Sequence, residues 1–359
     1  MTAVVVQLGQ RSYTIEIGTG NLSALGQRAS EWSALAHAVV ITDQNVEKLH
    51  AQKAAESLAA AGASVDILVV EPGEQTKSID AAADLWNKLV DLGADRKSVI
   101  VAVGGGVVGD LAGFVAATFA RGLPLVQVPT TLLAQVDSAV GGKVAINLAG
   151  AKNMVGAFWQ PGGVLVDTAV LATLLDREYR AGLAEVVKYG VILDVDFFAY
   201  LESHVAELER RDDAVLEQVI MRSCRLKADV VGQDEREETG RRSVLNYGHT
   251  FCHALEAVTG YGRYLHGEAV SIGMLCASRL AERLGRVDEK FTQRQRALLQ
   301  ALGLPVDFPA VDHDAILAAM SRDKKVEYGR LRFVLPTRMG HVELVGDVAE
   351  AHVRAVLIH

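Results

Sequence analysis

The chain has 359 residues, of which 50% are hydrophobic and 22% are charged, and this length favours two domains over one. Its formal net charge of -8 argues against a general nucleic-acid-binding protein, because such proteins concentrate positive charge on one face. The three cysteines form no C-x-x-C motif, so neither a disulfide framework nor a thiolate zinc site is indicated.

The first residues alternate like a strand and lack the basic stretch and apolar core of a secretory signal. Residues 98–120 are strongly apolar, but they include Asp110 and five glycines, a cluster that a membrane-spanning helix tolerates poorly. We therefore expect a cytoplasmic protein with no membrane partner and no nucleic-acid partner.

Short apolar runs alternate with helical patterns through the first half of the chain. Strands are predicted at 36–43, 64–70 and 98–103 and in the runs LPLVQVP and GGVLVD, and helices at 46–61 and 78–92. Gly62 and Gly93 follow the two helices, as is typical of helix C-termini. Strands separated by helices imply a parallel sheet with helices on both faces.

Helical periodicity dominates from about Thr173 onward. Only RLRFVLP and HVELVG resemble strands there, and they predict one hairpin. The sequence therefore predicts an α/β domain over residues 1–175 and a mainly helical domain over residues 176–359. A cleft between two such domains is a usual place for a ligand.

A glycine turn follows the strand predicted at 98–103. Gly104, Gly106 and Gly109 satisfy G-x-G-x-x-G before a helical run, which lets backbone N–H groups approach a pyrophosphate. A plain strand-to-helix turn is the alternative. Asp110 departs from the simple pattern, and its carboxylate could instead reach a ribose or nicotinamide group. Asp43 is a candidate for the adenosine ribose or, equally, a turn-forming aspartate.

A histidine-bearing helix is predicted in NYGHTFCHALEAVTG. Asn246, His249, His253 and Glu256 fall within an arc of about 80° on a helix of 100° per residue. Two histidines four residues apart can bind one metal ion, whereas the alternative is a solvated polar face with two incidental histidines.

Further candidate residues lie on the neighbouring helices. His266 and Glu268 begin the next long helix, and Glu185 and Lys188 lie one turn apart on an apolar helix. The pair on the apolar helix indicates either a site or an internal salt bridge. Histidine and carboxylate ligands without thiolate fit a catalytic zinc with an open coordination position.

Basic residues gather in a few loops. Lys143 follows a Gly-Gly turn, and Lys152 and Asn153 lie in a glycine-bounded loop, where solvated lysines are the alternative to a phosphate site. Further basic and acidic residues precede the histidine helix or the terminal hairpin, namely Lys227, Glu237, Arg242, Lys324 and Lys325. This distribution indicates a multiply anionic small molecule.

Long collinear motifs extend over nearly the whole chain: GGGVVGDLAGFVAATFARG, VPTTLLAQVDSAVGGKVAINLAGAKNMVGAFWQP, AGLAEVVKYG, DEREETGRRSVLNYGHTFCHALE and LHGEAVSIGM. Together they resemble the 3-dehydroquinate synthase family of the sugar phosphate cyclases. The resemblance implies a Rossmann-like NAD-binding α/β domain followed by a mostly helical domain that binds metal and substrate. It also implies a homodimer, with Arg121 reaching the neighbouring site. Cys252 stands where glycine is frequent in the family.

The resemblance also implies the residues of the site. The ligands of a divalent metal, zinc or cobalt, would be Glu185, His249 and His266, so that His253 becomes a substrate contact. Contacts to NAD would come from Asp43, Asn45, Glu74, Lys77, Gly104, Gly105, Gly106, Val107, Gly109, Asp110, Thr130, Thr131, Asp137, Lys143, Lys152 and Thr173. Catalytic and substrate contacts would come from Lys143, Lys152, Asn153, Lys188, Lys227, Glu237, Arg242, Asn246, His253 and Arg121, and from Lys324 in preference to Lys325.

The activity implied is ring closure of 3-deoxy-D-arabino-heptulosonate 7-phosphate to 3-dehydroquinate in the shikimate pathway. The steps are transient oxidation by NAD, β-elimination of phosphate, re-reduction and an intramolecular aldol reaction. The alternatives are another sugar phosphate cyclase, a metal-dependent alcohol or glycerol dehydrogenase, or a non-catalytic NAD- or metal-sensing module. The number of basic residues favours the dehydroquinate enzyme, since substrates without a carboxylate need fewer cations.

Overall fold

Two compact units make up the chain in the computed structural model, which describes residues 2–149, 151–260, 262–321 and 331–357. The first unit comprises Met1–Leu175 and Leu216–Arg236, and the second comprises Asp176–Val215 and Glu237–His359. The first segment of the first unit ends at Leu175. The segment 216–236, however, belongs to the first unit, whereas the sequence pattern placed it with residues 176–359.

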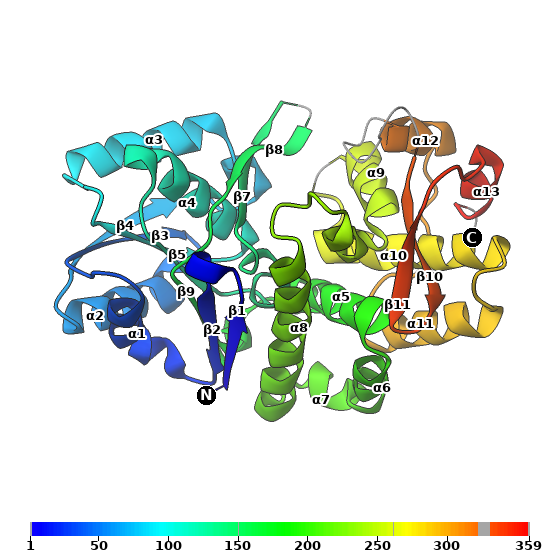
Figure 1. Ribbon diagram of the computed structural model, residues 1–359, viewed down its shortest axis with the longest axis horizontal. Helices are drawn as coiled ribbons and strands as arrows, with labels where there is room; N and C mark the ends of the chain where they lie inside the picture. The colour runs from blue at the N-terminus through cyan, green and yellow to red at the C-terminus, as the bar shows by residue number, and fades with distance from the viewer. Residues whose placement is uncertain (1, 150, 261, 322–330, 358–359) are drawn as a thin grey trace. The chain divides into compact units, whose positions relative to one another are not determined.

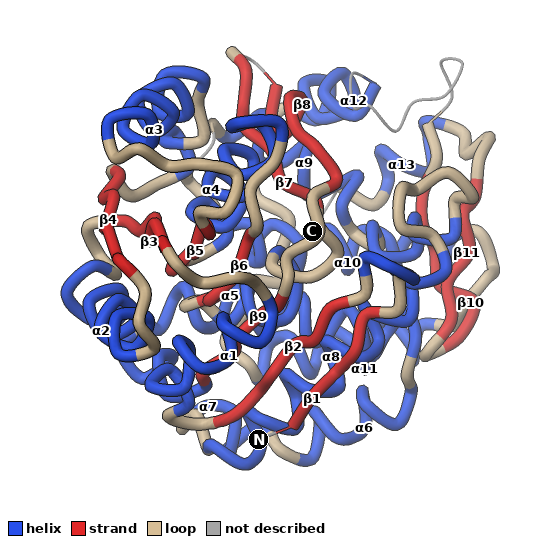
Figure 2. Tube along the Cα trace, turned by 60° about the vertical axis from the view of Figure 1, so that its left-hand side comes forward, coloured by secondary structure: helices blue, strands red, loops and turns tan. Residues whose placement is uncertain are grey.

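A seven-stranded sheet in the order β1-β2-β9-β6-β5-β3-β4 forms the centre of the first unit. All neighbouring strands are parallel except β1 and β2, which pair antiparallel at one edge. Figure 2 shows these two strands side by side. The predicted parallel sheet is therefore confirmed. The strands are β1 (Thr2–Val6), β2 (Tyr13–Gly18), β3 (His37–Asp43), β4 (Ser64–Val70), β5 (Val99–Gly104), β6 (Leu125–Pro129) and β9 (Gly163–Asp167).

Helices cover both faces of this sheet (Figure 1). Successive residues of a strand point to opposite faces, and in β3 Val39 packs into a different core cluster from Val40. The cluster of Val39 includes residues of α3 (Ile79–Asp91) and α4 (Gly106–Thr118), and that of Val40 includes residues of α1 (Leu25–Trp32) and α2 (Gln52–Ala60). Burial on both faces explains why these strands are continuous apolar runs.

A hairpin outside the main sheet adds β7 (Lys143–Leu148) and β8 (Ala151–Phe158) to the first unit. Lys143 begins β7, and Lys152 and Asn153 lie in β8. The sequence reading of this region as glycine-bounded loops was therefore wrong. Hydrogen bonds between the two strands satisfy the backbone there, although glycines flank them.

Helices dominate the second unit, in agreement with the sequence. Its two strands, β10 (Phe333–Arg338) and β11 (His341–Val345), form the predicted antiparallel hairpin. Asn246 lies in a 3-10 turn before α9 and not on that helix, because Gly248 turns the chain first with a φ of +79°. The helices are α5 (Asp176–Leu193), α6 (Val195–Ser203), α7 (Val205–Glu209), α9 (His249–Thr259), α10 (His266–Arg283), α11 (Glu289–Ala301), α12 (His313–Ser321) and α13 (Glu350–Ala355).

Helix α8 (Asp213–Gln233) supplies most of the segment that joins the first unit. The side chain of Lys227 donates to both the backbone carbonyl and the carboxylate of Asp137, at 2.7 and 2.6 Å. The thiol of Cys224 donates to the carbonyl of Gln135. These contacts explain why the helix groups with the sheet domain despite its place in the sequence. No helix among the described residues is both long and apolar enough to cross a lipid bilayer.

Candidate functional site

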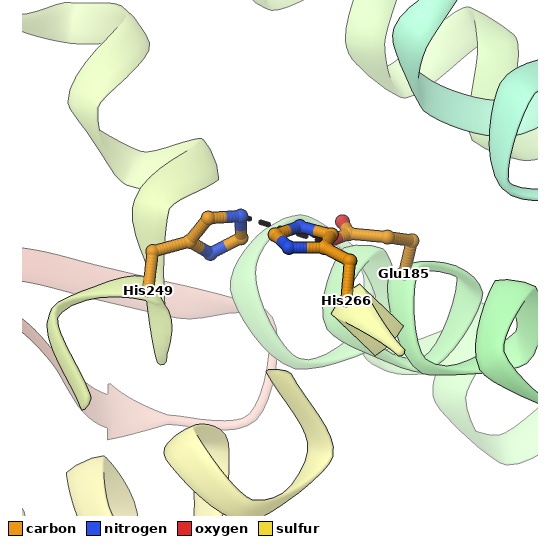
Figure 3. Close-up of side chains that lie close together, drawn as sticks. All are labelled: Glu185, His249 and His266. Atoms are coloured by element: carbon orange, nitrogen blue, oxygen red, sulfur yellow. Dashed lines mark ion pairs between the residues drawn. The ribbon is translucent and has the colours of Figure 1, made fainter. Parts of the chain in front are cut away.

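Three side chains of the second unit converge on one point, and each comes from a different helix (Figure 3). Glu185 lies in the middle of α5, while His249 and His266 are the first residues of α9 and α10. The Nε2 atoms of His249 and His266 lie 3.6 and 3.8 Å from Oε1 of Glu185. Glu185 is fully buried, and His249 is buried as well.

The chemistry of this donor set fits a divalent metal ion. Oε1 of Glu185 is buried and accepts no hydrogen bond from the residues that the structure describes, and burying a carboxylate oxygen without one is costly. Ligand atoms bound to one tetrahedral zinc at about 2.0–2.2 Å lie about 3.3–3.5 Å apart, close to the separations observed here. The other carboxylate oxygen forms an ion pair with Lys188, so the predicted internal salt bridge exists within the candidate site.

The two histidines have partners on their other ring nitrogen. Nδ1 of His249 lies 3.1 Å from the backbone carbonyl oxygen of Tyr247 and donates a hydrogen bond to it. In the neutral ring the proton is then on Nδ1, and Nε2, which faces Glu185, keeps its lone pair. Nδ1 of His266 faces the carboxylate of Glu256 at 3.5 Å and the thiol of Cys252 at 3.8 Å. Burial raises the pKa of this thiol to about 11, so it is protonated at neutral pH.

His253 lies outside the candidate metal-binding sets. The residues that the structure describes contain two sets able to hold a metal ion, Glu185 with His249 and His266, and Cys252 with Glu256 and His266. The ring of His253 lies edge-on to that of His249, with 5.6 Å between the ring centroids. The three residues implied by the resemblance thus form one of the two sets, and their role as metal ligands stays a prediction.

Glycines allow the helices of this centre to approach closely. A Cβ atom added to Gly267, directly after His266, would lie 1.8 Å from the backbone carbonyl oxygen of Ala181 on α5. A Cβ atom on Gly273 would lie 2.2 Å from the carbonyl oxygen of Gly248. Because these neighbours are backbone atoms, the close approach of α10 to α5 and to the start of α9 requires glycine.

A second cluster lies in the first unit around a buried lysine. Nζ of Lys77 donates to the Asp110 carboxylate at 2.6 Å and to the Asn153 side-chain oxygen at 2.5 Å, and it lies 3.6 Å from Glu74. Burial disfavours the charged form of Lys77, but Asp110 and Glu74 together outweigh it and raise the pKa of Lys77. The lysine therefore remains charged at neutral pH and holds the two carboxylates and Asn153 together.

Asn147 completes this cluster and was not predicted from the sequence. Its side chain donates to Glu74 at 2.8 Å and accepts from the backbone N–H of Asn153 at 2.8 Å. Asn153 has a φ of +54°, a left-handed conformation that asparagine tolerates better than most residues. The only sequence signal would have been the position of Asn147 between two runs of candidate residues.

The glycine turn lies where the sequence placed it, between β5 and α4. Gly105 caps α4, whose first residue is Gly106. A Cβ atom on Gly109 would lie 2.9 Å from the side-chain oxygen of Gln127 on β6, so this glycine permits close packing of helix and strand. Asp43 ends β3, and its carboxylate accepts the backbone N–H of Asn45 at 2.8 Å, which is the turn-forming role considered as the alternative. The contact of Asp43 with a ribose stays a prediction.

The family is decided by the sequence over most of the chain. Residues 67–181 match the family described as 3-dehydroquinate synthase N-terminal, and residues 182–326 match the one described as 3-dehydroquinate synthase C-terminal. The chain belongs to the 3-dehydroquinate synthase family. Its activity is that of this enzyme family, as the resemblance in the sequence indicated.

Relatives of this family are similar along their full lengths. A 3-dehydroquinate synthase of Rhodopirellula baltica is 49% identical over 362 residues, which cover 99% of this chain and 96% of that protein. A solved 2-deoxy-scyllo-inosose synthase in complex with carbaglucose-6-phosphate, NAD+ and Co2+ has a TM-score of 0.89 at 29% identity and covers 99% of both chains.

A second solved structure is 2-epi-5-epi-valiolone synthase of Streptomyces hygroscopicus subsp. jinggangensis with NAD+ and Zn2+. It has a TM-score of 0.89 at 27% identity and covers 99% of this chain and 98% of its own. The predicted architecture, a Rossmann-like α/β domain with a mainly helical second part, is therefore that of the sugar phosphate cyclases.

The residues predicted for a 3-dehydroquinate synthase site are divided between the two units. The second unit holds the three metal-ligand candidates and also Lys188, Glu237, Arg242, Asn246 and His253. The first unit holds the residues predicted to contact NAD and also Arg121, Lys143, Lys152, Asn153 and Lys227. Lys324 and Lys325 lie outside the described residues.

Proposed function

We propose that the chain catalyses a carbon–oxygen lyase reaction in which 3-deoxy-D-arabino-heptulosonate 7-phosphate loses phosphate and closes to 3-dehydroquinate in the shikimate pathway. Membership of the family supports this reaction. The observation that carries the metal-dependent part of the proposal is the convergence of His249 and His266 on the buried carboxylate of Glu185.

NAD and a divalent ion, zinc or cobalt, are the proposed cofactors, since related cyclases were solved with both kinds of group. When bound, NAD accepts a hydride and later returns it, and the ion acts as a Lewis acid toward a substrate hydroxyl group. In this proposal Glu185, His249 and His266 hold the ion, and Lys188 balances the negative charge of the fully buried carboxylate.

The cluster around Lys77 is proposed to contact the nicotinamide part of NAD through Glu74, Lys77 and Asp110. Its ion pairs fix the side chains before any ligand arrives, so little ordering is required on binding. Asn153, which accepts from the same lysine, is proposed to contact substrate. This shared hydrogen bond would connect the cofactor and substrate residues of the first unit.

The remaining cations are proposed to bind the phosphate and carboxylate groups of the substrate. Lys227 is held beside Asp137, and Arg242 is almost fully buried with Glu237 at 3.9 Å. Buried and fixed cations bind anions with less loss of side-chain entropy than mobile surface lysines. Lys143 is exposed and Lys152 is half-buried, which leaves them accessible to a ligand. Positioning and charge complementarity are then the main contributions of the protein.

A homodimer in the cytoplasm is also proposed. Arg121 is exposed, and Ala120, Arg121 and Gly122 all have positive φ values, of 48°, 69° and 124°. Positive φ values at Ala120 and Arg121 cost free energy that the surrounding structure must offset, and such residues cluster at functional sites. The resemblance assigns Arg121 to the site of the neighbouring subunit. Analytical ultracentrifugation, and recovery of activity when Arg121→Ala protein is mixed with a variant lacking a metal ligand, would test this role.

The reaction is tested by incubating the enzyme with the heptulosonate phosphate and NAD while phosphate release and absorbance at 340 nm are followed. We expect phosphate without lasting NADH absorbance, because the hydride is returned in each turnover. Accumulating NADH would indicate a dehydrogenase and contradict the proposal. Absence of phosphate release, with turnover of a different sugar phosphate instead, would indicate another cyclase.

The metal site is tested by exhaustive chelation and by matched variants on α9. Chelation should abolish activity, and zinc or cobalt should restore it. His249→Ala should lose the bound ion, whereas His253→Ala, four residues along the same helix, should retain it with reduced activity. Retention of zinc by the His249 variant, measured by atomic emission, would show that the ion lies elsewhere.

A further inference from the structure

Glu256 lies on the side of His266 that faces away from Glu185. It is on α9, seven residues after His249, and only 5% of it is exposed. Its Oε1 lies 3.5 Å from Nδ1 of His266, while Nε2 of the same ring lies 3.8 Å from Glu185. The imidazole of His266 therefore stands between two carboxylates of different helices.

A histidine ligand requires a lone pair on the nitrogen that faces the ion. Neutral imidazole carries one proton, and the hydrogen bond made by the other ring nitrogen decides where that proton lies. A carboxylate at Nδ1 accepts an N–H there, and Nε2 then keeps its lone pair. For His249 the Tyr247 carbonyl occupies the corresponding position, and for His266 it is Glu256.

Cys252 lies beside both Glu256 and Nδ1 of His266. Its thiol lies 3.7 Å from Oε2 of Glu256, within the range of a sulfur hydrogen bond, and donates to it. The two residues are one helical turn apart and both are buried. The thiol thus engages one carboxylate oxygen and leaves the other directed at His266.

From this geometry we infer that Glu256 is a positioning residue of the metal centre, which orients His266 and fixes its proton on Nδ1, and that Cys252 supports Glu256. This inference rests on the proposed function of Glu185, His249 and His266 as metal ligands. It adds a carboxylate that touches neither substrate nor cofactor and acts through a ligand.

The competing assignment is a metal ion held by Cys252, Glu256 and His266 themselves, a set with suitable separations. The partners of the two carboxylates favour the positioning role. Among the residues that the structure describes, the buried Oε1 of Glu185 has no hydrogen-bond partner, whereas Oε2 of Glu256 accepts from the Cys252 thiol.

The test compares zinc affinities of the metal-depleted wild-type protein and of variants, measured by competition with a chromophoric chelator. Loss of a carboxylate behind a histidine ligand typically weakens metal binding about 10- to 100-fold. We expect this loss for Glu256→Leu. Glu256→Gln, whose amide oxygen still accepts a hydrogen bond, should lose about three- to tenfold. Cys252→Ser should remain within about threefold of wild type.

Cobalt spectra separate the positioning role from a purely structural one. The Co2+ form of the wild-type protein should lack thiolate-to-cobalt charge transfer, and the d–d bands of Glu256→Gln should shift while its metal-free melting temperature stays near that of wild type. Wild-type zinc affinity in both Glu256 variants would overturn the inference. The inference would also be overturned by a thiolate-to-cobalt charge-transfer band in the wild-type protein that disappears in Cys252→Ser, because Cys252 would then be a ligand. If Glu256→Leu does not fold, the zinc affinity of Glu256→Gln decides alone. A Glu256→Gln protein that binds zinc as tightly as wild type would overturn the inference.

Failure of the proposed metal site gives a different result. If wild type does not bind zinc, or if Glu185→Gln binds it as tightly as wild type, the ligand set itself is wrong. If Glu185→Gln loses zinc and the Glu256 variants do not, the ligand set stands and only the role of Glu256 is refuted.

Discussion

Replacing Gly267 with alanine tests whether the helix crossing beside His266 sets the position of this metal-ligand candidate. The added methyl carbon would lie 1.8 Å from the carbonyl oxygen of Ala181. Ordinary contact begins near 3.4 Å, so α10 and α5 must separate by about 1.6 Å at this point. Because the obstacle is helix backbone, no side-chain rotation relieves it.

The expected effect has two parts. Overpacking of this kind costs about 1–3 kcal/mol and occasionally more, and the backbone contact indicates the upper end. For a unit of this size each kcal/mol lowers the melting temperature by about 2–4 °C, so we expect a fall of about 6–12 °C. Metal–ligand distances tolerate only about 0.2 Å, and moving His266 away from Glu185 by more should weaken zinc binding at least about 100-fold.

Calorimetry of the metal-free protein and zinc competition measure these two effects separately. Gly346→Ala is the matched control, because no atom of the described residues lies within 4 Å of its added methyl group and its φ is not left-handed. The control should melt within about 1–2 °C of wild type and bind zinc equally well. A Gly267→Ala protein with wild-type stability and zinc affinity would refute the argument that this glycine brings the helices together.

Three further predictions concern the other groups of the proposed site. Lys77→Met removes the partner of the Asp110 carboxylate, so we expect a loss of about 3 kcal/mol in unfolding free energy and weaker NAD binding by calorimetry. Lys143→Ala and Lys152→Ala should each lower kcat/KM at least about tenfold in the phosphate-release assay. Tyr247→Phe should destabilise by about 1–2 kcal/mol in chemical denaturation, since its buried hydroxyl donates to the α10 backbone or to Gln295.

Controls and contrary outcomes differ for each of these variants. Lys88→Ala, an exposed lysine of α3 paired with Asp84, should leave kcat/KM unchanged. Unchanged kcat/KM in both the Lys143 and Lys152 variants would show that these side chains are merely solvated. Unchanged stability of Lys77→Met would contradict a structural role of the ion pair, and a Tyr247→Phe protein as stable as wild type would show that water replaces the lost hydroxyl.

The sheet could be predicted from the sequence because its strands are buried on both faces. Residues 64–70 were predicted as a strand with the bounds that β4 has. The bounds of β3 differ from the prediction by one residue at the first end, and those of β5 by one residue at each end. The hairpin of β7 and β8 was not predicted, since its strands carry lysines and flanking glycines and lack a continuous apolar run. Val144 and Ile146 of β7 alternate with less buried residues, but so short an alternation between glycines is a weak strand signal.

The metal centre shows a different limit of sequence reasoning. Periodicity places residues on one face of one helix, and it could therefore pair only His249 with His253. The group observed takes one residue from each of three helices, whose meeting depends on packing at Gly267 and Gly273. Resemblance to the family supplied that information. Glu256 was noticed on the histidine face, but its role required the position of His266.

The position of helix α8 has a consequence for folding during synthesis. Protein synthesis proceeds from the N-terminus, yet the sheet unit needs Lys227 and its neighbours beside Asp137 and Gln135. Arg11, near the start of the chain, pairs with Glu235 at 2.6 Å. All seven strands of the sheet end by Asp167, and Lys227 is sixty residues later. During synthesis the surface that α8 covers therefore stays exposed after the strands themselves have been made.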